Sequence, residues 1–282
     1  MVPPLPDTER DADPSLVFII GLHRSGTTFL YQTMADGLPV AAVRLVHVLC
    51  WRELSAPEGP STLETLRAAL NETFRARGIS DRKIDRIHVS ANTVEEYGWI
   101  LRYAGGSMSL REATLPVFRE LCSLVPRTGE PEGPLVLKNP WDTGRVAWLV
   151  TTFPSARFVF LSRDPEAILR SQVNAAVSYA TEPHPFLGLL LAPIPRGWLY
   201  LAVHRWGRLL LGTVLFRAAV RVLLRASIRR ELKKFSAALS AVPASRRFEL
   251  AYEDLCTDPP GWLQRLREFL GTVPGDSPGR KS

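Results

Sequence analysis

Short apolar runs and longer amphipathic runs alternate along the chain. Residues 16–20, 135–138 and 157–161 are compact runs of β-branched, aliphatic and aromatic residues, which are typical of buried strands. Residues 40–43 and 248–252 predict two further strands. Helices are predicted at residues 27–35, 61–77, 116–125, 144–153 and 260–270, and after the cap Asp164 with Pro165 as first helical residue. The alternation predicts a single α/β domain with a parallel sheet flanked by helices.

Residues suited to binding an anion stand at the ends of three predicted strands. Gly21 and Arg163 follow two of these strands closely, and Lys138 is the last residue of a third. Parallel sheets bind their ligands beyond the carboxyl ends of the strands. We therefore expect Gly21, Lys138 and Arg163 to meet at one edge of the sheet.

The loop after the first strand, GLHRSGTTFL at residues 21–30, has the composition of an anion-binding turn. Gly21 and Gly26 allow a tight turn and close approach to a ligand, and the following helix N-terminus offers free amides. The spacing nearly matches the nucleotide-binding pattern G-x-x-x-x-G-K-[ST]. However, Thr27 replaces its lysine, and the cation is Arg24. A phosphate-loop nucleotide kinase or NTPase is therefore kept only as an alternative.

The same loop resembles the 5′-phosphosulfate loop of sulfotransferases that use 3′-phosphoadenosine 5′-phosphosulfate (PAPS). An EEYG segment at residues 95–98 and a KNPWD segment at residues 138–142 resemble a bacterial branch of that family. The run RFELAYEDLCTDPPGWLQRLREFLG resembles its last strand and helix. The resemblance extends over residues 17–271, with a poor match at residues 180–245. It implies a phosphate-loop-like sulfotransferase fold and transfer of a sulfuryl group from PAPS to a hydroxyl.

The resemblance also implies the residues that hold PAPS and the absence of a metal requirement. Arg163 and Ser171, eight residues apart, would bind the 3′-phosphate. Lys138 would face the transferring sulfuryl group and, with Arg24, offset the charge that develops on the leaving oxygen. In the loop, the 5′-phosphosulfate would be held by Gly21, Arg24, Ser25, Gly26, Thr27 and Thr28.

The catalytic base has two candidates, because the family places a His or a Glu just beyond the first helix. These are His47 and Glu53. His47 is preferred because the bacterial branch that the chain resembles carries a His here, and an imidazole suits deprotonation of an alcohol. The alternative is that the apolar segment VRLVHVLCWREL belongs to the core and that hydrogen bonds satisfy His47.

Three further ionisable residues receive no firm catalytic role. His23 lies inside the loop and is left unassigned. Glu95 and Glu96 could touch the acceptor. Because Thr93 and Glu96 have the spacing of a capping box, we expect the structural role for Glu96.

Composition adds few constraints on function. The 282 residues carry a net charge of +7, which favours an anionic ligand, acceptor or membrane surface. No zinc-finger, RNP or basic-leucine-zipper pattern is present, so nucleic acid is not an expected partner. The chain has three cysteines, Cys50, Cys122 and Cys256, which are scattered along the sequence. They predict neither a disulfide framework nor a zinc site. The acidic, proline-rich start differs from a secretory signal, so a cytoplasmic location is expected, with peripheral membrane contact as an addition.

Tails are expected at residues 1–15 and 273–282, around a domain at residues 16–272. Many cytosolic sulfotransferases close over the 3′-phosphate with a C-terminal Arg-Lys-Gly loop. Arg280 and Lys281 come too late in the chain to match that loop.

Residues 180–235 are expected to form a variable helical insertion. On a helix at residues 207–230, Arg217, Arg221 and Arg225 form one stripe, with an apolar face opposite. The preferred interpretation is a helix packed on the domain with its basic face exposed. The alternative is a membrane-surface helix or the wall of a site for a lipid-like acceptor. For the whole protein, a non-catalytic membrane-surface function is kept as a second alternative. The acceptor is left open among glycans, lipids and small metabolites.

Overall fold

The computed structural model describes residues 15–56, 62–85 and 87–272 and contains a five-stranded sheet in the order β2-β3-β1-β4-β5. All neighbouring strands pair in parallel, with Phe18 opposite Leu137 on one side and Phe158 on the other. The α/β fold predicted from the alternation is therefore confirmed. The strands are β1 (Leu16–Ile20), β2 (Ala41–Ala42), β3 (Leu135–Lys138), β4 (Arg157–Ser162) and β5 (Arg247–Ala251).

The helices follow the predicted order, with ends that differ by a few residues. Asp164 caps its helix by accepting hydrogen bonds from the amides of Glu166 and Ala167, as expected. The α-helices are α1 (Thr27–Gly37), α2 (Leu45–Leu49), α3 (Trp51–Leu54), α4 (Leu63–Ala76), α5 (Gly98–Gly105), α6 (Leu115–Leu124), α7 (Val146–Thr152), α8 (Pro165–Thr181), α9 (Pro185–Leu191), α10 (Leu199–Ala241), α11 (Tyr252–Thr257) and α12 (Pro259–Leu270). Short 3₁₀ turns are η1 (Glu112–Thr114), η2 (Val125–Thr128), η3 (Pro140–Arg145) and η4 (Ala244–Arg246).

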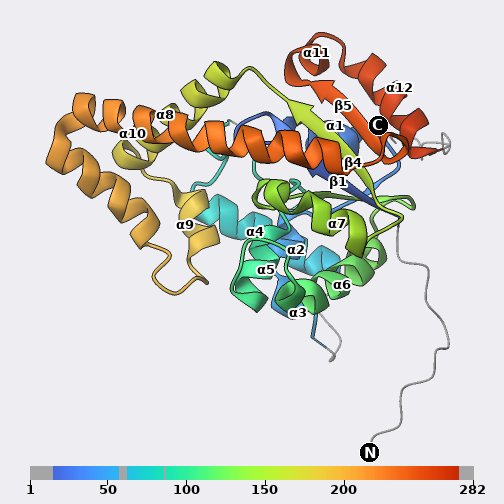
Figure 1. Cartoon of the computed structure of the whole chain (residues 1–282). Helices are drawn as coiled ribbons and strands as arrows, with labels where there is room; N and C mark the ends of the chain where they lie inside the picture. The colour runs from blue at the N-terminus through green and yellow to red at the C-terminus, as the bar shows by residue number, and fades with distance from the viewer. Residues whose placement is uncertain (1–14, 57–61, 86, 273–282) are drawn as a thin grey trace, which may run out of the picture.

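Helices cover both faces of the sheet, so its strands are buried on each side (Figure 1). Val17 and Ile19 of β1 point to the face covered by α1, α11 and α12. Phe18 points to the opposite face, where α2 and α4 to α7 supply the core. This alternation follows from the two-residue period of a strand and explains why the strand sequences are apolar throughout. The carboxyl ends of β1, β3 and β4 are left as the edge available for a site.

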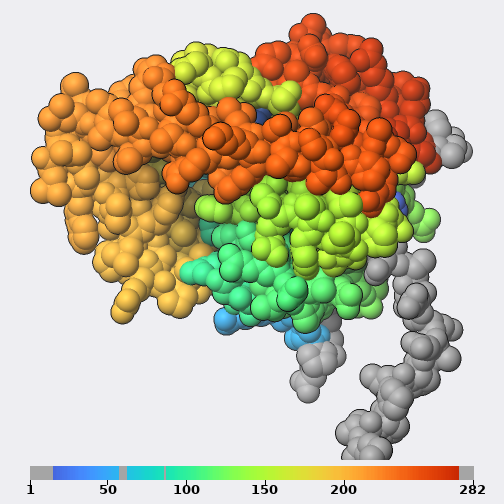
Figure 2. All heavy atoms as spheres, in the orientation of Figure 1, coloured from blue at the N-terminus to red at the C-terminus, as the bar shows by residue number. Residues whose placement is uncertain are grey.

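Residues 180–235 contribute α9 and most of α10. Helix α10 is interrupted at Gly212, which has φ 69° and ψ 164°. Figure 1 shows its two halves joined by a turn at the left edge of the molecule, away from the sheet, and Figure 2 shows that they form a projection there. The second half packs on α8 through a small apolar cluster that includes Ile168, Val173 and Ile228. No helix in the described part of the chain is long and apolar enough to cross a bilayer.

The basic stripe on α10 is exposed, as predicted, but the prediction that the apolar face opposite packs inward is wrong. Arg221 and Arg225 contact the carboxylate of Glu166 on α8 at 3.7 and 2.9 Å, and Arg217 donates a hydrogen bond to Asn174 at 3.0 Å. The carboxylate and amide come from a separate helix, which the pattern within α10 does not reveal. Apolar side chains expected to pack inward are instead exposed, namely Leu215, Val222 and Leu223.

Residues 1–14 and 273–282, including Arg280 and Lys281, lie outside the described residues. Cys50, Cys122 and Cys256 form no disulfide with one another. Within residues 15–56, 62–85 and 87–272, no cluster of three or more His, Cys, Asp or Glu side chains is arranged to hold a metal ion.

Candidate functional site

The loop between β1 and α1 takes a conformation that depends on its small residues. Arg24 and Gly26 both have positive φ, at 69° and 97°. A Cβ atom at Gly26 would lie 2.2 Å from the ring of Tyr252, and one at Gly21 would lie 2.6 Å from the Thr27 methyl group. Glycine is therefore required at both positions for steric reasons. The buried Ser25 hydroxyl donates a hydrogen bond to the Leu22 carbonyl at 2.7 Å, which stabilises the turn.

The N-terminus of α1 is open to an anion. Its cap residue is Gly26, so no side chain accepts a hydrogen bond from the first-turn amides. The first backbone hydrogen bond of the helix runs from the Leu30 amide to the Gly26 carbonyl, at 3.1 Å. The amides of Thr27 and Thr28 are thus among the N–H groups that lack an intrahelical acceptor. Together with the helix dipole, they form a site of positive potential inside the predicted loop.

Arg163 and Ser171 lie against the same loop, as predicted. Arg163 donates a hydrogen bond from Nη1 to the backbone carbonyl of Arg24 at 3.0 Å. The Nε of Arg24 donates to the hydroxyl of Ser171 at 3.0 Å, and its Nη2 donates to the Ile84 carbonyl at 2.8 Å. The Arg163 Nε is buried and has no hydrogen-bond partner in the described chain. Two guanidinium groups and a hydroxyl therefore form one cationic corner beside the loop.

The contacts of Arg24 differ from those expected of a residue that acts beside Lys138. Its guanidinium is directed to Ser171 and to Asp85, whose carboxylate lies 3.8 Å from Nη1. Lys138 makes its contacts elsewhere, with Thr28 and Glu96. Arg24 therefore belongs with the Arg163 corner and does not share a partner with Lys138.

Tyr252 is a site residue that sequence reasoning missed. It is the first residue of α11, directly after β5, and its ring lies 4.2 Å from the guanidinium carbon of Arg163. The same ring packs on Gly26, where a side chain would collide with it. Tyr252 therefore holds both Arg163 and the loop in place through a cation–π contact and through packing. The available signal was its position at the carboxyl end of another predicted strand.

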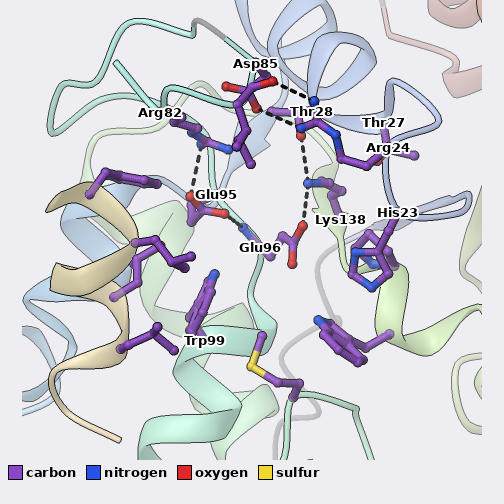
Figure 3. Close-up of a pocket in the computed structure, with 18 of the residues that line it drawn as sticks. His23, Arg24, Thr27, Thr28, Arg82, Asp85, Glu95, Glu96, Trp99 and Lys138 are labelled. Carbon is purple, nitrogen blue, oxygen red and sulfur yellow. Dashed lines mark hydrogen bonds and ion pairs between the residues drawn. The ribbon is translucent and has the colours of Figure 1, made fainter. Parts of the chain in front are cut away.

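Lys138 joins the loop to the EEYG segment, as Figure 3 shows. The ammonium group donates to the Thr28 hydroxyl at 2.9 Å and to a carboxylate oxygen of Glu96 at 2.7 Å. The Lys138 side chain is only 4% exposed and that of Glu96 15%, so the ion pair is largely shielded from water. A lysine with these partners lies next to the uncapped end of α1.

The expectation that Glu96 caps a helix with Thr93 is wrong. Helix α5 begins at Gly98, and the Thr93 hydroxyl accepts a hydrogen bond from the Ser90 amide and donates one to the His88 carbonyl. The Glu96 carboxylate is instead held by Lys138. The capping-box spacing was present, but no helix starts where it requires one.

A buried hydrogen bond fixes Glu96 opposite Lys138. Tyr97, in the EEYG segment, donates its hydroxyl hydrogen to Asp142, in the KNPWD segment, at 2.6 Å. Asp142 also accepts from Asn139 at 2.7 Å and from the Leu110 amide at 2.9 Å. Because Glu96 precedes Tyr97 and Lys138 precedes Asn139, this network holds the two charged residues face to face.

The charges around Lys138 shift the pKa of the neighbouring acids. Burial alone would raise the pKa of Glu96, but the charge and hydrogen bond of Lys138, together with His23 and Arg82, lower that pKa below its usual value. Burial raises the pKa of Glu95, although this carboxylate contacts Arg82 at 3.0 Å. Burial also lowers the pKa of His23, whose ring packs on Trp141. At neutral pH, Glu96 is thus an ionised carboxylate and His23 a neutral imidazole.

These residues line one cavity of about 820 Å³. One end is polar and contains the start of α1, Lys138, Glu96 and the Arg163 corner. The other end is apolar and aromatic and comes mainly from α5, α9 and the start of α10. Its lining includes Trp99, Met108, Tyr179, Phe186, Leu187, Leu190, Leu191, Ile194 and Tyr200. A volume of this size suits a small-molecule site.

Most of the predicted binding residues reach the cavity, but not all of them. Gly21 and Ser25 do not line it and act through the shape of the loop. The predicted residues that line it are Arg24, Gly26, Thr27, Thr28, Lys138, Arg163 and Ser171.

His47 lies away from the cavity, in the core. It is fully buried, its Nδ1 accepts a hydrogen bond from the Arg44 amide at 2.9 Å, and its Nε2 lies 2.8 Å from the Thr128 hydroxyl. Glu53 is exposed and is also absent from the cavity lining. These positions correct the prediction that His47 or Glu53 is the base and support the alternative of a core histidine. In the sequence, a single histidine in an apolar segment looks the same whether it is a catalytic base or a core residue.

The core position of His47 predicts acid lability. Burial, reinforced by Arg44 and Arg67, lowers its pKa from 6.5 to about 3. The unfolded chain then binds one more proton below the ordinary pKa, so stability is lost as pH falls through that value. We expect His47 to remove about 2 kcal/mol of unfolding free energy between about pH 7.5 and about pH 5. Urea unfolding at several pH values should show this loss in the wild type and a smaller one in His47→Gln. Identical pH dependence in both proteins would contradict it.

The chain is similar in sequence and in fold to known proteins. Protein-tyrosine sulfotransferase 1 from Danio rerio is 26% identical over 168 residues, which are 60% of this chain and 38% of that protein. The crystal structure of sulfotransferase STF1 from Mycobacterium tuberculosis H37Rv superposes with a TM-score of 0.57 at 19% identity, covering 94% of this chain and 69% of that one. Sulfotransferase STF9 from Mycobacterium avium gives 0.55 at 17% identity, covering 93% and 64%. This chain therefore spans about two fifths of the curated relative, and the two mycobacterial structures share its fold.

A sequence model described as Sulfotransferase family matches residues 14–188. The match is more than half of the 282 residues and includes the anion-binding loop, Lys138, Arg163 and Ser171. The chain belongs to the Sulfotransferase family.

Proposed function

We propose that this protein transfers a sulfuryl group from PAPS to a hydroxyl of an acceptor with an apolar body. The main support for the proposal is that two anion sites lie in one cavity. The open N-terminus of α1 forms the first site, and the Arg163 corner forms the second. PAPS carries anionic groups on both its 3′ and 5′ positions, so two such sites suit it.

The residues present fit this donor. The amides of Thr27 and Thr28 would hold the 5′-phosphosulfate, and Arg163, Arg24 and Ser171 would hold the 3′-phosphate. The buried, unpaired Nε of Arg163 and the uncapped end of α1 are donors that await an acceptor. Arginine binds phosphate well because its planar group can form two parallel hydrogen bonds.

Glu96 is the base that the geometry favours in place of His47. Its carboxylate lies in the cavity, is ionised at neutral pH and sits 2.7 Å from the Lys138 ammonium. The acceptor hydroxyl would give its proton to Glu96 as its oxygen forms a bond to sulfur. The bond between sulfur and the bridging phosphate oxygen breaks in the same step, and adenosine 3′,5′-bisphosphate (PAP) leaves with that electron pair. Lys138 would stabilise the negative charge that develops on the bridging oxygen.

The apolar end of the cavity supports an acceptor with an apolar body. The wall from α9, the segment after it and the start of α10 offers Phe186, Leu190, Ile194 and Tyr200, and Trp99 of α5 also lines the cavity. A glycan without an apolar part would leave these side chains without matching contacts. An amphiphile could place its hydroxyl at Glu96 and its apolar body on this wall.

A transfer assay tests the proposal. The full chain is incubated with PAPS carrying labelled sulfur and with hydroxylated acceptors, namely alkyl glucosides, phenols, sterols and free sugars, in the presence of a metal chelator. We expect label on an amphiphilic acceptor and release of PAP, with loss of both in Lys138→Met. Absence of transfer together with hydrolysis of magnesium ATP would support the kinase or NTPase alternative instead.

A further inference from the structure

The exposed apolar surface of the protein is concentrated on one element. Among the described residues, every exposed large apolar side chain except Phe29 and Trp141 lies in residues 198–223. Phe29 and Trp141 line the cavity. The remaining ones lie on α10 or directly before it. This helix lies entirely beyond residue 188, where the match to the family model ends.

The most exposed of these side chains flank the break in α10. Leu210 is 84% exposed and Val214 is 80% exposed, on either side of Gly212. We define the apolar tip as Leu209, Leu210, Leu211, Val214 and Leu215. Figure 2 shows that α10 forms the projection at the left of the molecule, and all five side chains of the tip are exposed. An apolar surface of this kind on a projecting element marks an interaction site.

The charged residues of the chain around the apolar tip are all arginines. Residues 196–230 contain eight arginines and no Asp or Glu. Glu166 of α8 contacts two of these arginines, Arg221 and Arg225. Arg205 is exposed, and no carboxylate contacts it in the described chain. A surface that joins apolar side chains to arginines is complementary to a layer that joins hydrocarbon to anionic groups.

We propose that the apolar tip docks on an anionic lipid bilayer and inserts its side chains among the headgroups. Leucine and valine at the tip would enter the acyl boundary, while the arginines would contact lipid phosphates. Trp198 and Trp206, both more than half exposed, have the amphipathic character suited to that depth. No helix of the described chain can span a bilayer, so the contact is interfacial.

A second copy of this chain fits the tip less well. Its own arginine-rich surface would repel an equally basic partner, because no carboxylate in residues 196–230 could offset the charge. A bilayer supplies both the hydrocarbon and the negative charge. The proposal rests on exposure and charge alone, and none of the five residues of the apolar tip lines the cavity.

Vesicle co-sedimentation of the full chain, without PAPS or acceptor, tests the docking. Vesicles of phosphatidylcholine alone are compared with vesicles that also contain phosphatidylglycerol. We expect binding to the anionic vesicles, weaker binding to the neutral ones, and a decrease as salt rises. The double variant Leu210→Gln with Val214→Gln should lose at least about tenfold in partition. Its affinity for PAP should match the wild type, which shows that it folds.

A matched pair of arginine variants tests the charge. Arg205→Gln on α10 should weaken binding to anionic vesicles, whereas Arg119→Gln, an exposed arginine on α6, should not. Equal binding of the wild type and the double tip variant would overturn the proposal. Sedimentation of the free protein tests the remaining alternative. If the protein is a dimer that the tip variant dissociates, and it does not bind vesicles, the tip contacts a second copy, and the proposal of membrane docking is overturned.

Discussion

The variant Glu96→Gln should lower kcat by at least about 100-fold, the effect typical of removing a general base. Glutamine keeps the shape and a hydrogen bond to Lys138, but it cannot accept the proton of the acceptor hydroxyl. Affinity for PAP should change little, because the Glu96 carboxylate contacts Lys138, whereas Arg163 contacts the carbonyl of Arg24. Initial rates of labelled sulfuryl transfer and calorimetric titration with PAP measure the two quantities.

Three variants act as controls for this result. His47→Gln and Glu53→Gln should keep turnover, because neither residue lines the cavity. His23→Gln removes the other basic group near Lys138. Full turnover in Glu96→Gln, together with loss in His23→Gln, would assign the base to the imidazole and contradict the role of Glu96.

The pH dependence of the rate gives a second readout for Glu96. Its pKa lies below the ordinary carboxyl value of 4.5, so the group stays ionised as pH falls from about 8 to about 6. The kcat of the wild type should therefore be nearly constant over that range. A base with an ordinary imidazole pKa would lose its activity within the same range.

The variant Arg163→Ala should weaken PAP binding by about 30- to 150-fold, which corresponds to about 2–3 kcal/mol for hydrogen bonds to a charged group. Adenosine 5′-monophosphate lacks the 3′-phosphate, so its affinity should change by less than about threefold. The difference separates loss of a phosphate contact from disorder of the loop, since Arg163 also binds the Arg24 carbonyl. Arg119→Ala, on the surface of α6, is the matched control. Equal losses for both nucleotides would show that Arg163 only supports the loop.

The strands and the anion-binding loop could be predicted because their signals are local. A buried parallel strand is apolar throughout, and the residue that follows it is placed by the strand itself. Gly21, Lys138 and Arg163 were therefore expected at one edge, and the register of β1 with β3 and β4 brings their strand ends together. The resemblance to sulfotransferases paired Arg163 with Ser171, and both now lie against Arg24.

The partners of buried charges could not be predicted, because they come from distant segments. Glu96 is 42 residues from Lys138 in sequence, and its local spacing from Thr93 indicated a helix cap. His47 gave the pattern of a base and of a core residue alike, and only its contacts with Arg44 and Thr128 distinguish them. On α10, Arg225 pairs with Glu166 of another helix, and the apolar side chains expected to pack inward are exposed.

The most direct test of the two-point nucleotide site is a crystal structure of the full chain with PAP. We predict that the 5′-phosphate lies on the amides of Thr27 and Thr28 while the 3′-phosphate accepts hydrogen bonds from Arg163 and Ser171. A nucleotide bound outside the cavity, or one whose 3′-phosphate lies at the start of α1, would contradict it.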